Sequence, residues 1–147
     1  MKGVLKVAAD IFFSRLLMRL LYARRCLTER SFDSGVNGWQ WCWRCWFLQK
    51  MVGINRHVLF PVAVSNVIGN PRNLHFSPDD LNIFQHFGCY FQCWHGQIHL
   101  GKRTYIAPNV GMITENHDVE NLDAHQPAQD IVLGEKCWVG MNAVILP

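Results

Sequence analysis

The sequence lacks a strong excess of charge of either sign, which narrows the classes of partner. Its 147 residues include 14 Lys and Arg against 11 Asp and Glu, for a formal net charge of +3. Nucleic-acid-binding domains usually concentrate basic side chains on one face, so this balance predicts no nucleic-acid partner. Half of the residues are hydrophobic and 17% are charged, which argues against wholesale disorder and provides for a hydrophobic core.

Long apolar runs are also missing near the N-terminus. Between Val4 and Ala23 the longest unbroken apolar run is four residues, whereas a transmembrane helix needs roughly 20. No small-residue cleavage site follows, as a signal peptide would require. Residues 4–23 therefore predict an amphipathic helix that packs on the domain, with weak contact to a membrane surface as the alternative. We expect a cytoplasmic protein, at most peripheral to the inner membrane face.

A secreted disulfide framework is not expected, because the chain is too long and its core too large to need disulfides for stability. We interpret all six cysteines as reduced thiols. The alternative is a zinc site, because Cys42 and Cys45 have the spacing of ligands and Cys89 and Cys93 could complete a set of four. The second pair lies in a strand-like stretch with no turn residue between its members, so we expect no metal.

A change of character near residue 55 divides the chain into two parts. Residues 1–55 predict a helical, Trp-rich appendage in which Trp39, Trp41, Trp43 and Trp46 fall within eight residues. This cluster fits either a strand with one aromatic face or the start of a buried helix. Its large rings are expected to fill core rather than to bind a ligand. Residues 56–147 contain recurrent Pro and Gly, which exclude long helices and favour short strands joined by tight turns.

The second part contains a six-residue repeat. Four complete hexads span residues 100–105, 106–111, 133–138 and 139–144. Each begins with an aliphatic residue, continues with Gly or Ala, and has a small residue in fifth place. If each hexad is one flat side of a three-sided coil, its first residue points inward and stacks on its equivalent one coil away. The inward residues are then Leu100, Ile106, Leu133, Val139 and Ile145.

These hexads carry a resemblance to a known family. Residues 98–118 and 131–147 closely resemble the hexapeptide-repeat O-acetyltransferases of sugars and polysaccharides, and the resemblance extends over about residues 56–147. It implies a mainly β fold, a left-handed parallel β-helix, assembled as a homotrimer. It also implies transfer of an acetyl group from acetyl-CoA, as co-substrate, to a hydroxyl of a saccharide or similar small acceptor.

The resemblance also implies a site. The polar insertion after Met112 contains His117, which matches the catalytic base of the family, and an imidazole suits proton transfer near pH 7. Its ring needs an orienting partner, for which Asp118, Glu115 or a backbone carbonyl would serve. His125 is expected to be a plain loop residue. The implied acceptor-side residues are Asn116, Asp118 and Trp138, and the implied contacts to the CoA arm are Met141, Asn142 and Ala143.

Two departures from the family pattern keep alternatives open. The relatives place an Asn on an earlier coil, where Phe87 falls here, and their chains continue past the Ile-Leu-Pro that ends this sequence. We therefore expect a C-terminally truncated domain, with a non-catalytic β-helix that only oligomerises as the first alternative. The second is a zinc-dependent protein of the γ-type carbonic anhydrase kind, because His95 and His99 could share one strand face.

Overall fold

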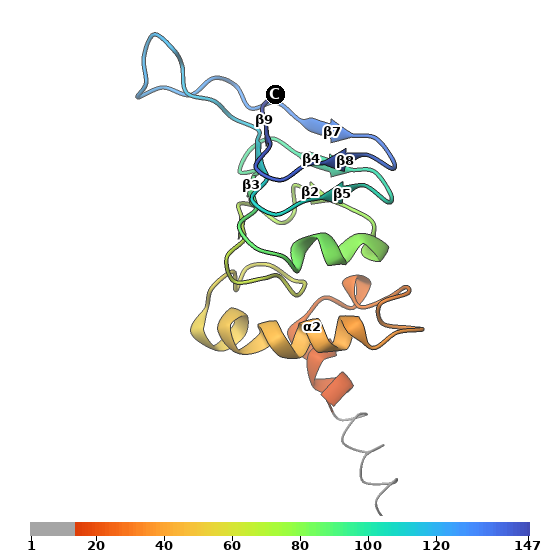
Figure 1. Ribbon diagram of the computed structural model, residues 1–147. Coiled ribbons are helices and arrows are strands. Elements are labelled where there is room, and N and C mark those ends of the chain that lie inside the picture. Colours follow the sequence, from red (N-terminus) through yellow and green to blue (C-terminus); the bar gives the residue numbers. More distant parts are fainter. Residues whose placement is uncertain (1–13) are drawn as a thin grey trace, which may run out of the picture.

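The computed structural model of the protein describes residues 14–147, and its N-terminal part is helical (Figure 1). Of the amphipathic segment predicted at residues 4–23, the first ten residues lie outside the described part, and residues 14–21 are helical. The helical elements that follow are η1 (Arg24–Cys26), α2 (Asn37–Trp46) and η2 (Phe47–Val52), the last being π-helical. Within residues 14–147, no helix combines the length and apolarity needed to cross a membrane.

The tryptophan cluster forms the helix α2, so the helical alternative is the correct one. Trp39 is buried, and its indole N–H donates a hydrogen bond to the carbonyl of Phe32 at 3.1 Å. The guanidinium groups of Arg15 and Arg19 lie over its ring, at 5.3 and 5.5 Å from the centroid. Trp43, about one turn further along the helix, is 41% exposed. Trp39 therefore fills core, as expected for a large aromatic ring.

The rest of the chain forms short parallel strands in three sheets. The strands are β1 (Val67–Ile68), β2 (Leu74–His75), β3 (Tyr90–Gln92), β4 (Ile98–Leu100), β5 (Tyr105–Ile106), β6 (Gly111–Ile113), β7 (Ile131–Leu133), β8 (Trp138–Val139) and β9 (Val144–Ile145), with a 3-10 helix, η3 (Pro78–Phe84), after β2. The sheet orders are β1-β3-β6-β9, β2-β4-β7 and β5-β8. From β3 onward the chain therefore visits the three sheets in rotation, and β3-β4-β5 and β6-β7-β8 are two successive circuits. The predicted mainly parallel β fold is confirmed.

The first residues of the hexads stack as predicted. Strand register pairs Leu100 with Leu133 and Ile106 with Val139, one circuit apart. The two residues of the earlier circuit are buried, and Leu133, Val139 and Ile145 are partly buried and pack against the core. Aliphatic side chains repeated at this position are thereby removed from water, which is the main driving force for stacking the circuits.

Two further hexad positions are explained by the backbone. A Cβ atom at Gly101 would lie 2.4 Å from the carbonyl carbon of Gly134, so the close approach of neighbouring circuits requires glycine there. The fourth residue of every hexad has a positive φ: Arg103 (63°), Asn109 (59°), Lys136 (57°) and Asn142 (63°). These residues turn the β4–β5, β5–β6, β7–β8 and β8–β9 corners in the left-handed conformation, a role that the sequence repeat did not reveal.

A buried amide joins the helices to the strand-forming part. Gln49 of η2 accepts a hydrogen bond from the Tyr22 hydroxyl at 3.2 Å, and its own NH₂ donates to the carbonyls of Val58 and Phe60, each at 2.9 Å. The hydrophobic core is also continuous, because Met18, Trp39 and Cys42 of the helical part belong to one cluster with the buried residues of the sheets. The N-terminal helices are thus packed against the strands rather than tethered to them.

Candidate functional site

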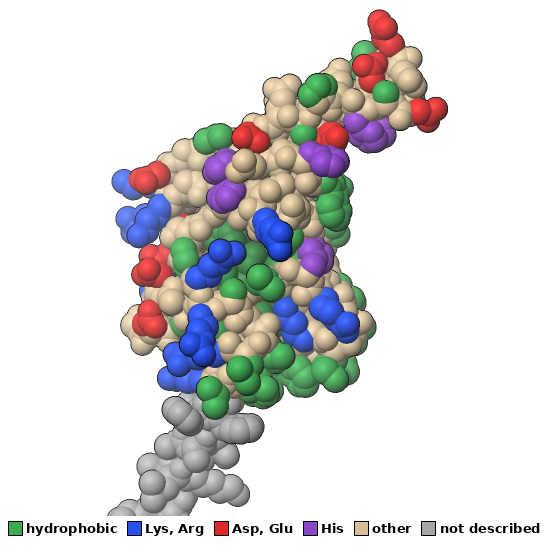
Figure 2. Space-filling view, turned by 180° about the vertical axis from the view of Figure 1, so that it is seen from behind, with side chains coloured by type: hydrophobic (Ala, Val, Ile, Leu, Met, Phe, Trp, Pro, Cys, Tyr) green, Lys and Arg blue, Asp and Glu red, His purple; other side chains and the backbone are tan. Residues whose placement is uncertain are grey.

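A polar insertion between β6 and β7 carries most of the candidate site. The insertion, residues 114–130, leaves the stacked strands and projects as a long loop (Figure 1). Acidic side chains gather at its tip and histidines lie nearer to its base, as Figure 2 shows. A cleft of about 510 Å³ opens where the loop meets β3 and β6. Its lining residues are Tyr90, Gln92, Trp94, His95, Ile113, Glu115, His117 and His125.

His117 lines this cleft with its ring held in one orientation. Its Nδ1 lies 2.8 Å from the carbonyl oxygen of Leu122. A carbonyl oxygen only accepts hydrogen bonds, so Nδ1 carries the proton of the neutral ring and Nε2 keeps its lone pair. Of the three orienting partners that the sequence left open, the backbone carbonyl is therefore the one observed. Nε2 of the exposed ring is available as a proton acceptor.

His125 lies against His117, which the sequence did not predict. The two ring centroids are 4.3 Å apart with an interplanar angle of 37°, and the two residues form an antiparallel β-bridge. The Asp118 N–H donates to the carbonyl of Ala124, at 2.9 Å, and so also joins the two arms of the loop. His125 is therefore a constituent of the cleft rather than a plain loop residue. No repeat marks it, because the hairpin that brings the two histidines together occurs once among residues 14–147.

The loop is anchored to β3 by a buried polar pair. Thr114 is fully buried, and its N–H and hydroxyl lie 2.9 and 3.0 Å from the side-chain oxygen of Gln92. The Thr114 hydroxyl also lies 2.9 Å from the Gln92 carbonyl. Buried polar groups that satisfy one another in this way fix geometry, because breaking one bond leaves an unpaired group. The first residues of the insertion consequently have a defined position above β3.

Glu115 pairs with His95 across the cleft. Its Oε2 lies 2.9 Å from Nδ1 of His95. The hydrogen bond from His95 lowers the pKa of Glu115 below its ordinary value. Glu115 is thus a carboxylate at neutral pH. It presents hydrogen-bond acceptors to the cleft and does not orient His117.

The remaining predicted site residues do not line this cleft. Asp118 accepts hydrogen bonds from the N–H groups of Glu120 and Asn121, at 2.8 and 3.2 Å, and so shapes the loop. The carbonyl of Asn116 accepts from Gln126 N–H at 2.9 Å. These contacts give both predicted acceptor-binding residues a role inside the loop.

The predicted acceptor and CoA contacts near the C-terminus lie elsewhere on the strands. Trp138, on β8, is 79% exposed. Residues Met141 to Ala143 form the corner between β8 and β9, where Met141 is 54% exposed. The structure therefore brings Glu115 and His117 together in one cleft, and not Trp138 or the 141–143 corner.

The residues considered as zinc ligands are used otherwise. Cys42 and Cys45 are buried on α2, and burial raises the pKa of the Cys42 thiol to about 12. Cys89 and Cys93 lie 3.3 Å from the carbonyl oxygens of Ala107 and Asn70. All six cysteines are free. His99 stacks on His75 in the neighbouring strand, and no group of three or more His, Cys, Asp or Glu among residues 14–147 is arranged to hold a metal ion.

Comparison with known proteins gives no match: no family model, curated protein or solved structure matches the chain. The cleft offers an oriented imidazole, a carboxylate and two partly exposed aromatic rings, since Tyr90 is 39% and Trp94 51% exposed. Such a set suits proton transfer on a hydroxylated ligand whose apolar face packs on the rings.

Proposed function

We propose that the three sheets are the faces of a left-handed parallel β-helix and that the protein is a hexapeptide-repeat O-acyltransferase. It would move an acetyl group from acetyl-CoA to a hydroxyl of a saccharide or similar small acceptor. The proposal for the fold is supported by strands that visit three parallel sheets in rotation with the hexad positions in register. The proposal for the function is carried by one observation: the Leu122 carbonyl holds His117 with Nε2 unprotonated in the neutral ring.

In the proposed reaction, Nε2 of His117 accepts the proton of the acceptor hydroxyl while the hydroxyl oxygen attacks the thioester carbonyl carbon. The tetrahedral intermediate collapses to the ester and expels the CoA thiolate, which recovers the proton from the imidazolium. General base catalysis of this kind contributes about 10²–10⁴-fold to the rate. Backbone N–H groups near the loop are the natural donors to the oxyanion.

A saccharide acceptor fits the walls of the cleft. Glu115, ionised through its bond with His95, can accept hydrogen bonds from sugar hydroxyls. Trp94 and Tyr90 offer partly exposed rings, on which the apolar face of a pyranose can stack. Sugar binding and proton abstraction would then use neighbouring surfaces of one cleft.

A homotrimer is part of the proposal, because the remaining contacts lie outside the cleft. Trp138 and Met141 are large, apolar and exposed, as expected of side chains that a neighbouring subunit or a bound molecule covers. We retain Trp138 as an acceptor contact and Met141, Asn142 and Ala143 as contacts to the CoA arm. Both sets would complete the site at a subunit boundary.

The experiment is acetyl transfer from acetyl-CoA to a panel of saccharides, with the acetylated product measured by mass spectrometry. His117→Ala should lower kcat by about 10²–10⁴-fold and leave the Kd for CoA unchanged, because the ring acts on the acceptor. His99→Ala is the matched control, since His99 stacks on His75 and does not line the cleft. Full turnover by His117→Ala would exclude the proposed base. Oligomers that fold but transfer no acetyl group would favour a non-catalytic β-helix instead.

A further inference from the structure

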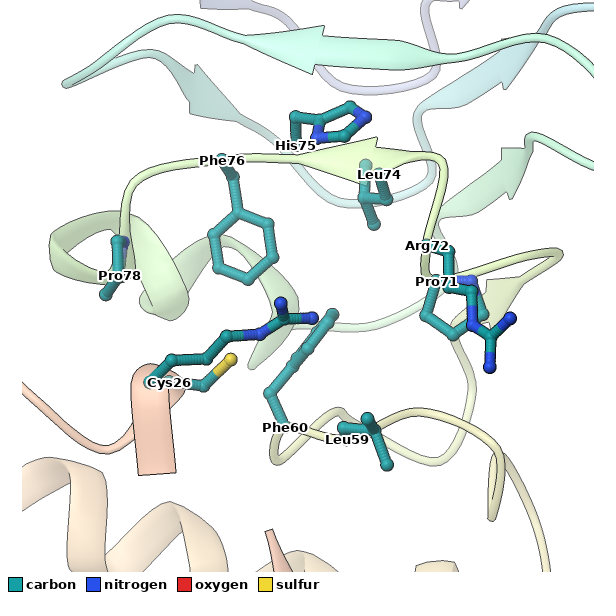
Figure 3. Close-up of a pocket in the computed structure, with 10 residues that line it drawn as sticks. Cys26, Leu59, Phe60, Pro71, Arg72, Leu74, His75, Phe76 and Pro78 are labelled. Atoms are coloured by element: carbon teal, nitrogen blue, oxygen red, sulfur yellow. The ribbon is translucent and has the colours of Figure 1, made fainter. Parts of the chain in front are cut away.

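A second hollow lies between η1 and β2 (Figure 3) and shares no lining residue with the cleft of His117. Its volume is about 330 Å³, which falls in the range of small-molecule sites. Three separate segments form its walls, and Phe60, Leu74 and Phe76 point into it (Figure 3). The lining residues are Arg25, Cys26, Leu59, Phe60, Pro71, Arg72, Leu74, His75, Phe76 and Pro78.

The apolar wall of this hollow is rigid. The ring of Phe60 packs against Phe76 and Phe84, with centroid distances of 4.9 Å in both cases, and Phe76 and Phe84 are 4.7 Å apart. Burial raises the pKa of the Cys26 thiol above its ordinary value, although the neighbouring Arg25 opposes this effect. The sulfur therefore stays uncharged and adds apolar surface. A hydrocarbon chain or ring would meet a preformed surface here.

The polar part of the lining is entirely cationic or neutral. Arg25 and Arg72 are both exposed, and no Asp or Glu lines the hollow. The only ion pairs among residues 14–147 are His95–Glu115 and Lys102–Asp79, so neither arginine is neutralised by an acidic partner in that part of the chain. Two guanidinium groups beside one apolar cavity attract an anionic head group, with which arginine forms charge-assisted hydrogen bonds.

The distribution of charge along the chain favours the same ligand. Residues 14–72 contain nine Lys and Arg against two Asp and Glu, a net charge of +7, whereas residues 73–147 contain three against eight, a net charge of −5. Figure 2 shows Lys and Arg side chains over the helical end and acidic side chains at the tip of the projecting loop. The two opposite charges largely cancel in the small net charge of the whole chain, +3. The resulting field steers anions toward the basic part of the chain, which contributes Arg25 and Arg72 to the hollow.

We propose that this hollow binds an anionic amphiphile, with its apolar body on Phe60, Leu74 and Phe76 and its phosphate or carboxylate head between Arg25 and Arg72. The ligand is either a free amphiphile or a lipid of an anionic bilayer, because both present the same chemistry. Leu59, at the edge of the hollow and 49% exposed, extends the apolar contact outward. This site is separate from the proposed acyltransfer cleft, and its ligand binding does not depend on acyl transfer.

The test is calorimetric titration of the full chain with octyl phosphate, compared with octanol and with inorganic phosphate. Octyl phosphate should bind, and each half of the ligand alone should bind at least about tenfold more weakly, because each uses only one part of the site. Arg25→Gln and Arg72→Gln should each weaken octyl phosphate binding by about tenfold, the usual worth of a charge-assisted hydrogen bond. Arg24→Gln is the matched control, since it removes the same charge from the adjacent exposed residue, which does not line the hollow. Leu59→Gln should weaken octyl phosphate and leave inorganic phosphate unchanged.

Sedimentation with vesicles of equal parts phosphatidylcholine and phosphatidylglycerol identifies the source of the ligand. Vesicle binding that Arg25→Gln and Arg72→Gln reduce, and that octyl phosphate inhibits, would assign a bilayer lipid. Octyl phosphate binding without vesicle binding would assign a free amphiphile. The proposal is overturned if octanol binds as tightly as octyl phosphate, if Arg24→Gln costs as much affinity as Arg25→Gln, or if octyl phosphate does not bind.

Discussion

Gly101→Ala should destabilise the protein far more than the same change at Gly140, although both glycines hold second place in a hexad. The added methyl carbon at 101 would lie 2.4 Å from the carbonyl carbon and oxygen of Gly134 and 2.5 Å from the backbone nitrogen of Glu135. Carbon atoms rest at about 3.5–4.0 Å, so the two circuits must move apart by roughly 1 Å. The obstacle is backbone, which cannot rotate away as a side chain can.

The cost follows from what that displacement disturbs. The Gly101 N–H donates to the Leu133 carbonyl at 2.9 Å, and the Thr104 hydroxyl donates to the Gly134 carbonyl at 2.6 Å. Overpacking costs about 1–3 kcal/mol, and weakening such a hydrogen bond adds about 1 kcal/mol. We expect Gly101→Ala to lower the free energy of unfolding by about 2–4 kcal/mol. At Gly140 a Cβ atom meets nothing within 4 Å, so Gly140→Ala should be neutral or stabilising by up to about 1 kcal/mol.

Urea denaturation followed by circular dichroism measures both changes, provided that the slope of the transition is the same in the three proteins. Gly134→Ala serves as an intermediate case, because its nearest neighbour would be the Cys137 sulfur at 3.9 Å, an ordinary contact. The expected order of stability is Gly101→Ala well below Gly134→Ala and Gly140→Ala. Equal midpoints for the variants at 101 and 140 would refute the packing of one circuit on the next.

Three further predictions concern the corners, the cleft and the thiols. Lys136→Gly should raise the free energy of unfolding by about 0.5–1 kcal/mol, because glycine adopts the positive φ of 57° without strain; a lower urea midpoint would contradict this. The hydrogen bond from His95 lowers the pKa of Glu115 in the folded protein. Ionised Glu115 therefore stabilises the fold at pH values above its ordinary, unfolded-state pKa. This stabilisation is lost as the pH falls through the lower pKa of the folded state. Unfolding midpoints of the native protein and Glu115→Gln should accordingly converge in acid and differ near neutral pH, whereas parallel curves would be inconsistent with the pair. Iodoacetamide should modify the half-buried Cys137 well before Cys42, because burial raises the pKa of the Cys42 thiol to about 12. Peptide mass spectrometry measures both rates, and equal rates would show that α2 opens readily.

The features that the sequence predicted are those that recur. Leu100 and Leu133 occupy the same hexad position and stack in register. Equivalent positions in successive circuits have the same buried environment, so similar residues occupy them. The positive φ of the fourth hexad residue recurs too, but the residue types at that position show no common pattern. Asn109 and Asn142 suit a positive φ, whereas Arg103 and Lys136 have the same φ with side chains that signal nothing of it.

The features that the sequence left open depend on single tertiary contacts. The spacing of the tryptophans at 39 to 46 fits both helical and strand periodicity. The packing of Trp39 against Phe32 and two arginines distinguishes the helix from the strand. Likewise, His117 could be identified by resemblance, but its partner is a backbone carbonyl, which every residue possesses. His125 meets His117 only because the loop folds back on itself. Side-chain chemistry alone gives no sign of either contact.

The neck of the projecting loop has an evolutionary consequence. The Gln129 N–H donates to the Thr114 carbonyl at 2.8 Å, and the Gln97 N–H donates to the Asp130 carboxylate at 2.7 Å, so both ends of the insertion are fastened to the strands. Residues beyond this neck can be lengthened, shortened or exchanged without shifting the register of β6 and β7, since the entropy of closing a loop grows slowly with its length. The segment can therefore be exchanged as one unit. Recombination of this segment can change ligand preference among descendants while the stacked strands beneath it are inherited unchanged.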